Sequence, residues 1–114
     1  MENNKSTIQQ TLQSWFPNAF NNGENYDEVS DYAALRQFAQ YTLKLINQNK
    51  PETTDPFKII YLLYHKGSLH DKNAIENEYF TYLAKDESPG TLKKHLELMP
   101  DELKSIYIKT ILEN

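Results

Sequence analysis

The chain has 114 residues, 16 acidic against 12 basic side chains, a net charge of −4 and no cysteine. This length suits one domain with one buried core, and the lack of cysteine excludes disulfide frameworks, zinc ribbons and thiol nucleophiles. Arg36 is the only arginine among the basic residues. Because arginine is the side chain best suited to bidentate phosphate binding, we expect no nucleic-acid partner.

The N-terminal residues contain no apolar run typical of a signal peptide. No later segment approaches the ~18 apolar residues of a membrane-spanning helix. We therefore expect a cytoplasmic protein without a membrane partner.

Turn and capping residues mark the expected helix ends, beginning at the N-terminus. Ser6 and Gln9 have the spacing of a capping box, which predicts a first helix ending at about Trp15. Residues 17–25 have no apolar period and contain an Asn-Asn-Gly turn signal, so they predict a polar loop. The longest segment of helical apolar spacing follows, from about residue 27 to residue 48.

The middle of the chain predicts an αα-hairpin. Asp55, followed by a proline, can cap its first helix, and Gly67 supplies a left-handed residue that ends it. Asp71 or Asn73 can start the second helix. Residues 59–64 are apolar almost all round, so a buried strand is an alternative there. A helix is favoured because helix-end signals flank the run and no partner strand is evident.

Two shorter helices complete the prediction. A Ser-Pro-Gly break ends the hairpin, Thr91 can cap the next helix, and Pro100 opens the last one. We expect one all-α domain of five or six helices in stacked αα-hairpins forming a compact bundle. Residues 1–26 would be a helix plus a polar loop, and residues 27–113 the hairpin core. The predicted core residues are Leu35, Phe38, Ile60, Leu63, Ile75, Tyr79, Leu83, Ile106 and Ile111.

Histidines near the hairpin turn are the best candidates for chemistry. His65, His70 and Asp71 could converge there, which makes a small enzyme or metal-binding protein the alternative function. Neither H-E-x-x-H nor E-x-x-H occurs, and a metal site needs three or four ligands, so structural roles for these residues are favoured. His95 lies beside an apolar stripe, and this position predicts that it is a buried structural histidine. We expect no catalytic residue, metal or other cofactor.

An acidic run lies at the start of the longest predicted helix. It contains four carboxylates and no basic residue, a pattern typical of a helix N-terminus. It could also dock a basic protein partner, because such patches steer association. The residues that we predict to meet a partner are Glu24, Tyr26, Asp27, Glu28 and Asp31.

The eight tyrosines divide between core and surface positions. Tyr32, Tyr79 and Tyr107 fall on apolar stripes and are predicted to be buried. Tyr41, Tyr61 and Tyr64 are less easily buried together, and any exposed tyrosine would suit a protein interface.

Three sets of residues carry a resemblance to a known family. They are Leu35, Phe38, Ala39 and Tyr41; then Asn73, Ala74, Ile75, Glu76, Tyr79, Phe80 and Leu83; and last Met99, Pro100, Leu103 and Tyr107. The chain resembles a family of small bacterial helical domains of unknown function, some of whose relatives are immunity-like proteins beside polymorphic toxins. The resemblance implies a helical-hairpin stack without catalytic residues. Together these observations predict a non-catalytic protein-binding module with an immunity or regulatory role.

Overall fold

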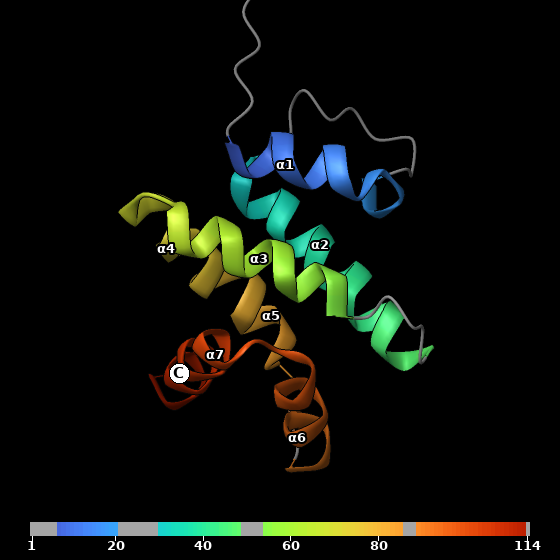
Figure 1. The fold of residues 1–114 in the computed structure, drawn as a ribbon, viewed down its shortest axis with the longest axis vertical. Coiled ribbons are helices and arrows are strands. Elements are labelled where there is room, and N and C mark those ends of the chain that lie inside the picture. The colour runs from blue at the N-terminus through green and yellow to red at the C-terminus, as the bar shows by residue number, and fades with distance from the viewer. Residues whose placement is uncertain (1–6, 21–29, 49–53, 86–88, 114) are drawn as a thin grey trace, which may run out of the picture.

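The computed structural model of the chain describes residues 7–20, 30–48, 54–85 and 89–113, all drawn in colour in Figure 1. In chain order the elements are α1 (Thr7–Trp15), the 3₁₀-helix η1 (Pro17–Phe20), α2 (Asp31–Asn47), α3 (Thr54–Lys66), α4 (Leu69–Ala74), the π-helix η4 (Ile75–Phe80), α5 (Thr81–Leu83), α6 (Pro89–Leu98) and α7 (Asp101–Glu113). Because α4, η4 and α5 follow one another without a break, they form one long helix, which we call the 69–83 helix. No strand occurs in these residues, which confirms the all-α prediction and the helix over residues 59–64.

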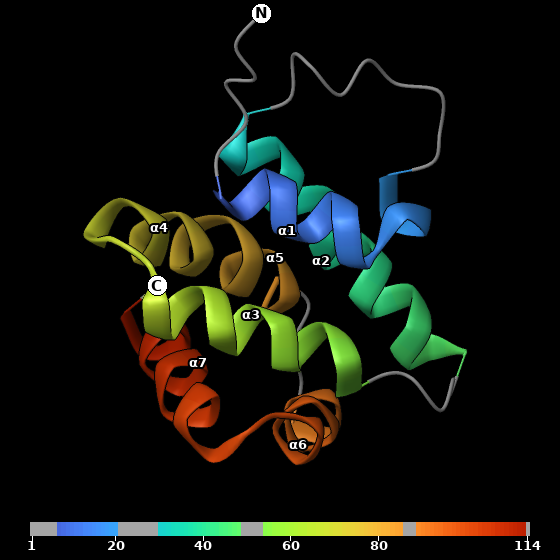
Figure 2. The ribbon, with the colours of Figure 1, turned by 45° about the horizontal axis from the view of Figure 1, so that its top comes forward.

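The helices form a compact bundle. α1 lies at one end of the long axis and α6 and α7 at the other, with α2, α3 and the 69–83 helix between them in both views (Figures 1 and 2). The radius of gyration is 13.6 Å, close to the value of about 13 Å for a compact chain of this length. The prediction of a compact helical bundle is confirmed for the part of the chain that the structure describes.

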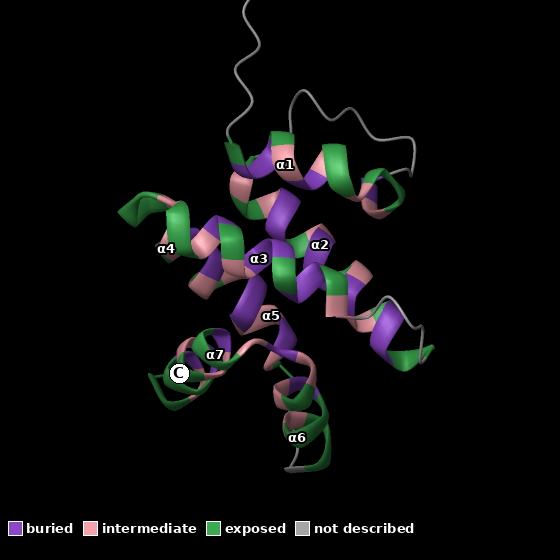
Figure 3. Cartoon of the chain, viewed as in Figure 1, coloured by how far each residue is buried: buried purple, intermediate pink, exposed green. Residues whose placement is uncertain are grey.

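A cluster of aromatic rings lies where the central helices meet. Phe38 of α2 stacks on Tyr79 of η4 with 5.8 Å between ring centroids, and Phe57 of α3 meets Tyr79 edge to face at 6.5 Å. Phe80 contacts Tyr107 of α7 at 5.5 Å. All of these rings are fully buried, and Figure 3 shows buried positions running along the same central helices. The cluster therefore joins four helices in one core.

Seven of the nine predicted core residues are buried, and the two exceptions lie on α7. Ile106 and Ile111 are only partly buried, so their assignment to the core was wrong. α7 instead turns Leu103, Tyr107 and Thr110 toward the core. These three follow the spacing i, i+4, i+7 of one helix face, and Ile106 and Ile111 flank that face.

The π-helical segment explains why the 69–83 helix buries adjacent aromatic residues. In a π-helix the backbone hydrogen bonds reach five residues back instead of four, so each turn holds more residues. Thr81 reinforces this turn because its hydroxyl donates to the carbonyl of Glu76, five residues earlier, at 3.0 Å. The wider turn lets Ile75, Tyr79 and Phe80 all point into the core.

The start of α2 lies later than predicted. α2 begins at Asp31, where the hydroxyl of Ser30 accepts the backbone N–H of Ala33 at 3.1 Å and caps the helix. The predicted start near Asp27 and the predicted capping box at Ser6 lie outside the described residues. α6 also starts differently, since it begins at the proline before Gly90 and not after Thr91.

The start of α4 shows which of several possible caps is used. The hydroxyl of Ser68 accepts the N–H of Asp71 at 3.2 Å, and the Asp71 carboxylate accepts the N–H of Ser68 at 3.3 Å. This reciprocal capping box satisfies two donors at once. Ser68 is therefore the N-cap residue, and the predicted caps at Asp71 and Asn73 were wrong.

The prediction of a polar loop after the first helix is wrong for residues 17–20. Pro17 opens the short helix η1, whose last residue, Phe20, is fully buried in the core, and Ala19 packs against the core beside it. The rigid φ angle of proline favours such a helical turn. The remaining residues of the predicted loop, 21–25, lie outside the described residues.

Gly67 ends α3 for a different reason from the one predicted. Its φ angle is not in the left-handed region, so a left-handed cap is wrong. The close approach of its neighbours explains the glycine. A Cβ atom at this position would lie 2.6 Å from the carbonyl oxygen of Leu63 and 2.7 Å from the Cβ of Asp71. The chain can turn this tightly from α3 into α4 only because residue 67 has no side chain.

Candidate functional site

A groove lined largely by apolar residues lies between α1 and α3, near the N-terminal end of the bundle. It has a volume of about 310 Å³. From α1 come residues spaced four apart, and from α3 residues spaced three and four apart, so each helix offers one face. The lining residues are Thr7, Thr11 and Trp15 of α1, Ile59, Leu62, Leu63 and Lys66 of α3, and Gly67 and Asp71 beyond α3.

Two large apolar side chains of the groove face solvent. Trp15 is 70 % exposed and Leu62 is 48 % exposed. Single exposed apolar residues are common, but two that line one hollow form an exposed apolar patch of the kind that marks interaction sites. Ile59 and Leu63, which lie next to Leu62 in the groove, are buried and form its floor.

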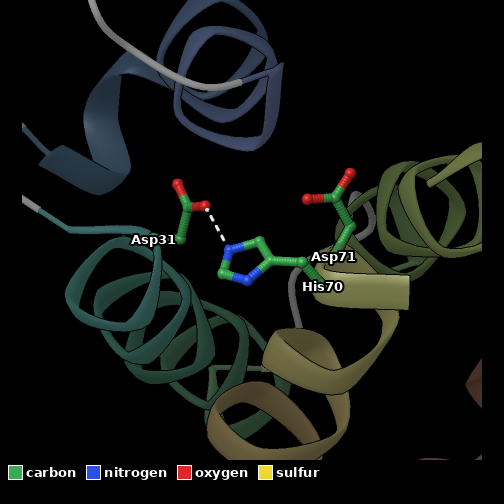
Figure 4. A group of neighbouring side chains, drawn as sticks. All are labelled: Asp31, His70 and Asp71. Atoms are coloured by element: carbon green, nitrogen blue, oxygen red, sulfur yellow. Dashed lines mark hydrogen bonds and ion pairs between the residues drawn. The ribbon is translucent and has the colours of Figure 1, made fainter. Parts of the chain in front are cut away.

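A group of metal-ligating side chains lies beside one end of this groove. Figure 4 shows His70, at the start of α4, with its ring directed toward Asp31 at the start of α2. His70 Nε2 lies 3.2 Å from Asp31 Oδ2, and one ligand atom each of Asp31, His70 and Asp71 lie within 4.8 Å of one another. Asp71 also lines the groove, so the two features meet at this residue.

Neighbouring side chains hold the group in place. Gln9 of α1, itself buried, donates its amide to Asp31 Oδ1 at 3.0 Å. The other oxygen of Asp31 then faces His70, whose ring stacks on Tyr32 with 6.2 Å between centroids. Tyr32 is 44 % exposed, so its predicted burial was wrong. The buried face of α2 begins two residues later, at Ala34 and Leu35.

His65 does not belong to this group. Its ring stacks on Tyr61, four residues earlier on α3, with 5.6 Å between centroids. The predicted meeting of His65, His70 and Asp71 was therefore wrong in one member, and Asp31 takes that place. The sequence offered no signal for this exchange, because Asp31 and His70 are 39 residues apart.

Most of the residues predicted to meet a partner lie outside the part of the chain that the structure describes. Asp31 is the only one in the described part of the chain, and its side chain is 12 % exposed. Glu24, Tyr26, Asp27 and Glu28 lie outside the described residues, and their role stays a prediction.

His95 lies in a second hollow, at the other end of the bundle. It is 5 % exposed, as predicted for a structural histidine, and its Nδ1 lies 3.2 Å from the Tyr107 hydroxyl. The hollow has a volume of about 320 Å³ and is lined by Leu43, Asn47, Tyr82, Leu83, Lys85, Thr91 and His95. The bond to Tyr107 ties α6 to α7 and accounts for a histidine among apolar residues.

Two acids of the 69–83 helix, Glu76 and Glu78, pair with side chains of α3 and α2. The Tyr64 hydroxyl donates to the Glu76 carboxylate. The pKa of Tyr64 is raised to about 12, mainly by burial and to a smaller extent by this carboxylate. Glu78 accepts from Arg36 at 3.1 Å on another side of the helix. Glu76 and Glu78, which are two residues apart, thus have separate partners.

Sequence reasoning missed the groove, although one signal was present. The run 59–64 is apolar almost all round, and such a helix has more apolar surface than one core can cover. Leu62 is the apolar residue of this run that the core leaves exposed to solvent. Trp15 gave a weaker signal, as the last residue of a short helix whose other apolar residues, Ile8 and Leu12, are buried.

Comparisons with known proteins give a family without an assigned function. No curated protein and no solved structure matches the chain. Among the described helices, none combines the length and the apolar character that crossing a lipid bilayer requires. A family model described as "Domain of unknown function (DUF7674)" matches residues 9–113, which include all of the elements from η1 to α7. The chain therefore belongs to the DUF7674 family of domains of unknown function.

Proposed function

We propose that this protein is a non-catalytic protein-binding module that receives an amphipathic helix of its partner in the groove between α1 and α3. The observation that carries the proposal is the pair Trp15 and Leu62, large apolar side chains that line one groove and face solvent. Tryptophan is among the residues that contribute most to binding at protein interfaces.

The shape of the groove favours a helix as the bound element. Two helix faces line it, one from α1 and one from α3, and an amphipathic helix fits such a hollow with apolar residues at i, i+3, i+4 and i+7. A third helix placed there would cover the exposed part of Trp15 and Leu62. Its apolar side chains would meet Ile59 and Leu63 on the floor.

The groove itself is lined by one base, Lys66, and one acid, Asp71, and it is the net negative charge of the chain that favours a basic partner. Asp71 lines the end of the groove that lies beside Asp31. The acidic residues Glu24, Asp27 and Glu28 precede Asp31 in the sequence, and the chain as a whole carries a net charge of −4. A basic partner would be attracted over a distance, and this attraction would raise the association rate.

The non-catalytic character of the proposal rests on the sequence. Cysteine is absent, and no nucleophile elbow or glycine-rich phosphate loop occurs. An immunity role, which the resemblance to immunity-like proteins implies, would make the partner a toxin. A regulatory role would make it another protein of the same cell. The neighbouring gene distinguishes them, since a toxin and its immunity protein are expected side by side.

The proposal is tested by capturing proteins from the native host with the wild-type chain and with groove variants. We expect Trp15→Ala and Leu62→Ala each to lose a partner that the wild type retains, because each removes apolar area that binding would bury. The matched control is Leu112→Ala on α7, where Leu112 is 80 % exposed and does not line the groove. This variant should retain the partner.

The association rate with the captured partner, measured at several salt concentrations, tests the acidic residues. Reversing Glu24, Asp27 and Glu28 to lysine should slow association and weaken its dependence on salt. Asp31 is left unchanged because it bonds Gln9 and His70. A partner held equally by the wild type, Trp15→Ala and Leu62→Ala would refute binding in the groove. Unchanged association of the reversed variant at low salt would refute the role of the acidic run alone.

A further inference from the structure

We propose that Asp31, His70 and Asp71 bind a divalent transition-metal ion of the Zn²⁺ kind, between the first turns of α2 and α4. The inference rests on these three side chains and not on the groove. It would stand if the groove bound nothing.

The types of ligand atom suit such an ion. One imidazole nitrogen and two carboxylate oxygens are ligands that Zn²⁺ accepts, at about 2.0–2.2 Å each. Three protein ligands leave a fourth position for water or a partner's side chain, as in open zinc sites. Because the chain has no cysteine, no thiolate competes with these ligands for the ion.

The distance between the first two ligand atoms fits a shared ion. Two atoms that each lie about 2.1 Å from one ion at angles between a right angle and the tetrahedral angle are about 3.0–3.4 Å apart. His70 Nε2 and Asp31 Oδ2 are 3.2 Å apart. The ligand atoms of the whole group lie within 4.8 Å of one another, whereas two ligands of one ion span at most about 4.2 Å, so the three side chains must draw closer together around the ion. The His70 side chain is 61 % exposed, so its ring can adjust to the ion.

The surroundings of the group resemble the outer shell of a built metal site. Ligating carboxylates in proteins are themselves hydrogen-bonded, which fixes the oxygen that faces the metal. Gln9, which is 8 % exposed, bonds Oδ1 of Asp31 and leaves Oδ2 toward His70. The Asp71 carboxylate is also hydrogen-bonded, since its Oδ2 accepts the N–H of Ser68. Tyr32 stacks on the imidazole.

Acidic residues at helix starts are common and need no metal, so the position of His70 is the decisive observation. Helix capping explains Asp71, and the helix dipole explains an acid in the first turn of α2. Neither explains an imidazole directed from one helix start to the carboxylate of another. A hydrogen-bonded ion pair and a metal site at this contact predict different responses of the protein to Zn²⁺.

The test is a titration of the full chain, purified without a histidine tag, with ZnCl₂. We expect one ion per chain in isothermal titration calorimetry and a rise in melting temperature, because an ion that binds only the folded state stabilises it. Co²⁺ should give the visible absorption of a low-symmetry site. MgCl₂ at the same concentration should change nothing, since Mg²⁺ prefers oxygen ligands in octahedral geometry.

Conservative variants separate this site from adventitious binding. His70→Gln, Asp31→Asn and Asp71→Asn should each abolish the response, although each keeps the size of its side chain. Gln9→Ala should weaken binding by about tenfold, as loss of an outer-shell partner does. The matched control is His65→Gln, because His65 also lies near this turn but stacks on Tyr61 away from the group. It should respond as the wild type does.

Three results would overturn the proposal. Absence of heat and of any melting shift with Zn²⁺ would leave an ion pair between two helices. An equal response of His70→Gln and the wild type would assign the binding to other surface groups. Equal loss in His65→Gln and His70→Gln would assign it to the predicted histidine pair. Far-ultraviolet circular dichroism of each variant verifies that it is folded.

Discussion

Replacing Tyr79 with alanine is expected to lower the free energy of unfolding by about 3–5 kcal/mol. The ring is fully buried, stacks on Phe38 and meets Phe57 and Phe80 edge to face. Its loss would leave a cavity at the junction of α2, α3 and the 69–83 helix, where the surrounding helices cannot close in fully. Urea unfolding followed by circular dichroism measures the change.

The matched variant Tyr79→Phe separates the ring from its hydroxyl. The Tyr79 hydroxyl and Thr42 Oγ1 lie 2.9 Å apart, and burial raises the pKa of Tyr79 above its usual range. Phenylalanine keeps every ring contact, and Thr42 keeps its bond to the Phe38 carbonyl. The cost should therefore be only about 1 kcal/mol. Equal losses of unfolding free energy in the two variants would contradict the central aromatic cluster, and so would a loss below about 1 kcal/mol for Tyr79→Ala.

Replacing Gly67 with alanine is expected to destabilise the protein by about 1–3 kcal/mol, the usual cost of overpacking. The added Cβ would lie 2.6 Å from the Leu63 carbonyl oxygen and 2.7 Å from the Asp71 Cβ. Since the first is a backbone atom at the end of α3, it cannot move aside without changing the turn. The capping box of Ser68 and Asp71 should be disturbed as well.

Gly90→Ala is the matched control for this substitution. Within the described part of the chain, and apart from its two neighbours and the backbone of α6 itself, no atom lies within 4 Å of a Cβ built at residue 90. Alanine should therefore stabilise the protein there by about 0.5–1 kcal/mol, because it favours a helix more than glycine does. If both substitutions changed stability by the same amount and in the same direction, the close approach at Gly67 would be wrong.

The fold was largely predictable because apolar spacing and capping residues act locally. The all-α class, the long α2 and the hairpin over α3 and α4 follow from patterns within ten or twenty residues. Errors arose where several local solutions compete, as at Ser68 and Asp71. The π-helical turn of η4 was not predicted, because apolar spacing alone does not reveal a change from α-helical to π-helical hydrogen bonding.

The candidate sites were less predictable because tertiary packing creates them. Leu62 is apolar like its buried neighbours, and only the final arrangement of α1 and α3 leaves it exposed beside Trp15. Asp31 and His70 come from distant segments that α2 and α4 bring together. A sequence reveals a site that lies on one element more readily than a site that needs two, since no short spacing connects its members.

Fluorescence of Trp15 tests the proposed function most directly, because it is the only tryptophan of the chain and lies in the groove. Excitation at wavelengths that tyrosine does not absorb reports on this side chain alone when the captured partner has no tryptophan or has its tryptophans replaced. In the free protein the emission should be that of a solvent-exposed indole. If the partner binds in the groove, the emission should shift to shorter wavelength as the partner is added and reach a plateau at saturation. Saturating binding with an unchanged emission spectrum would contradict a partner helix between α1 and α3.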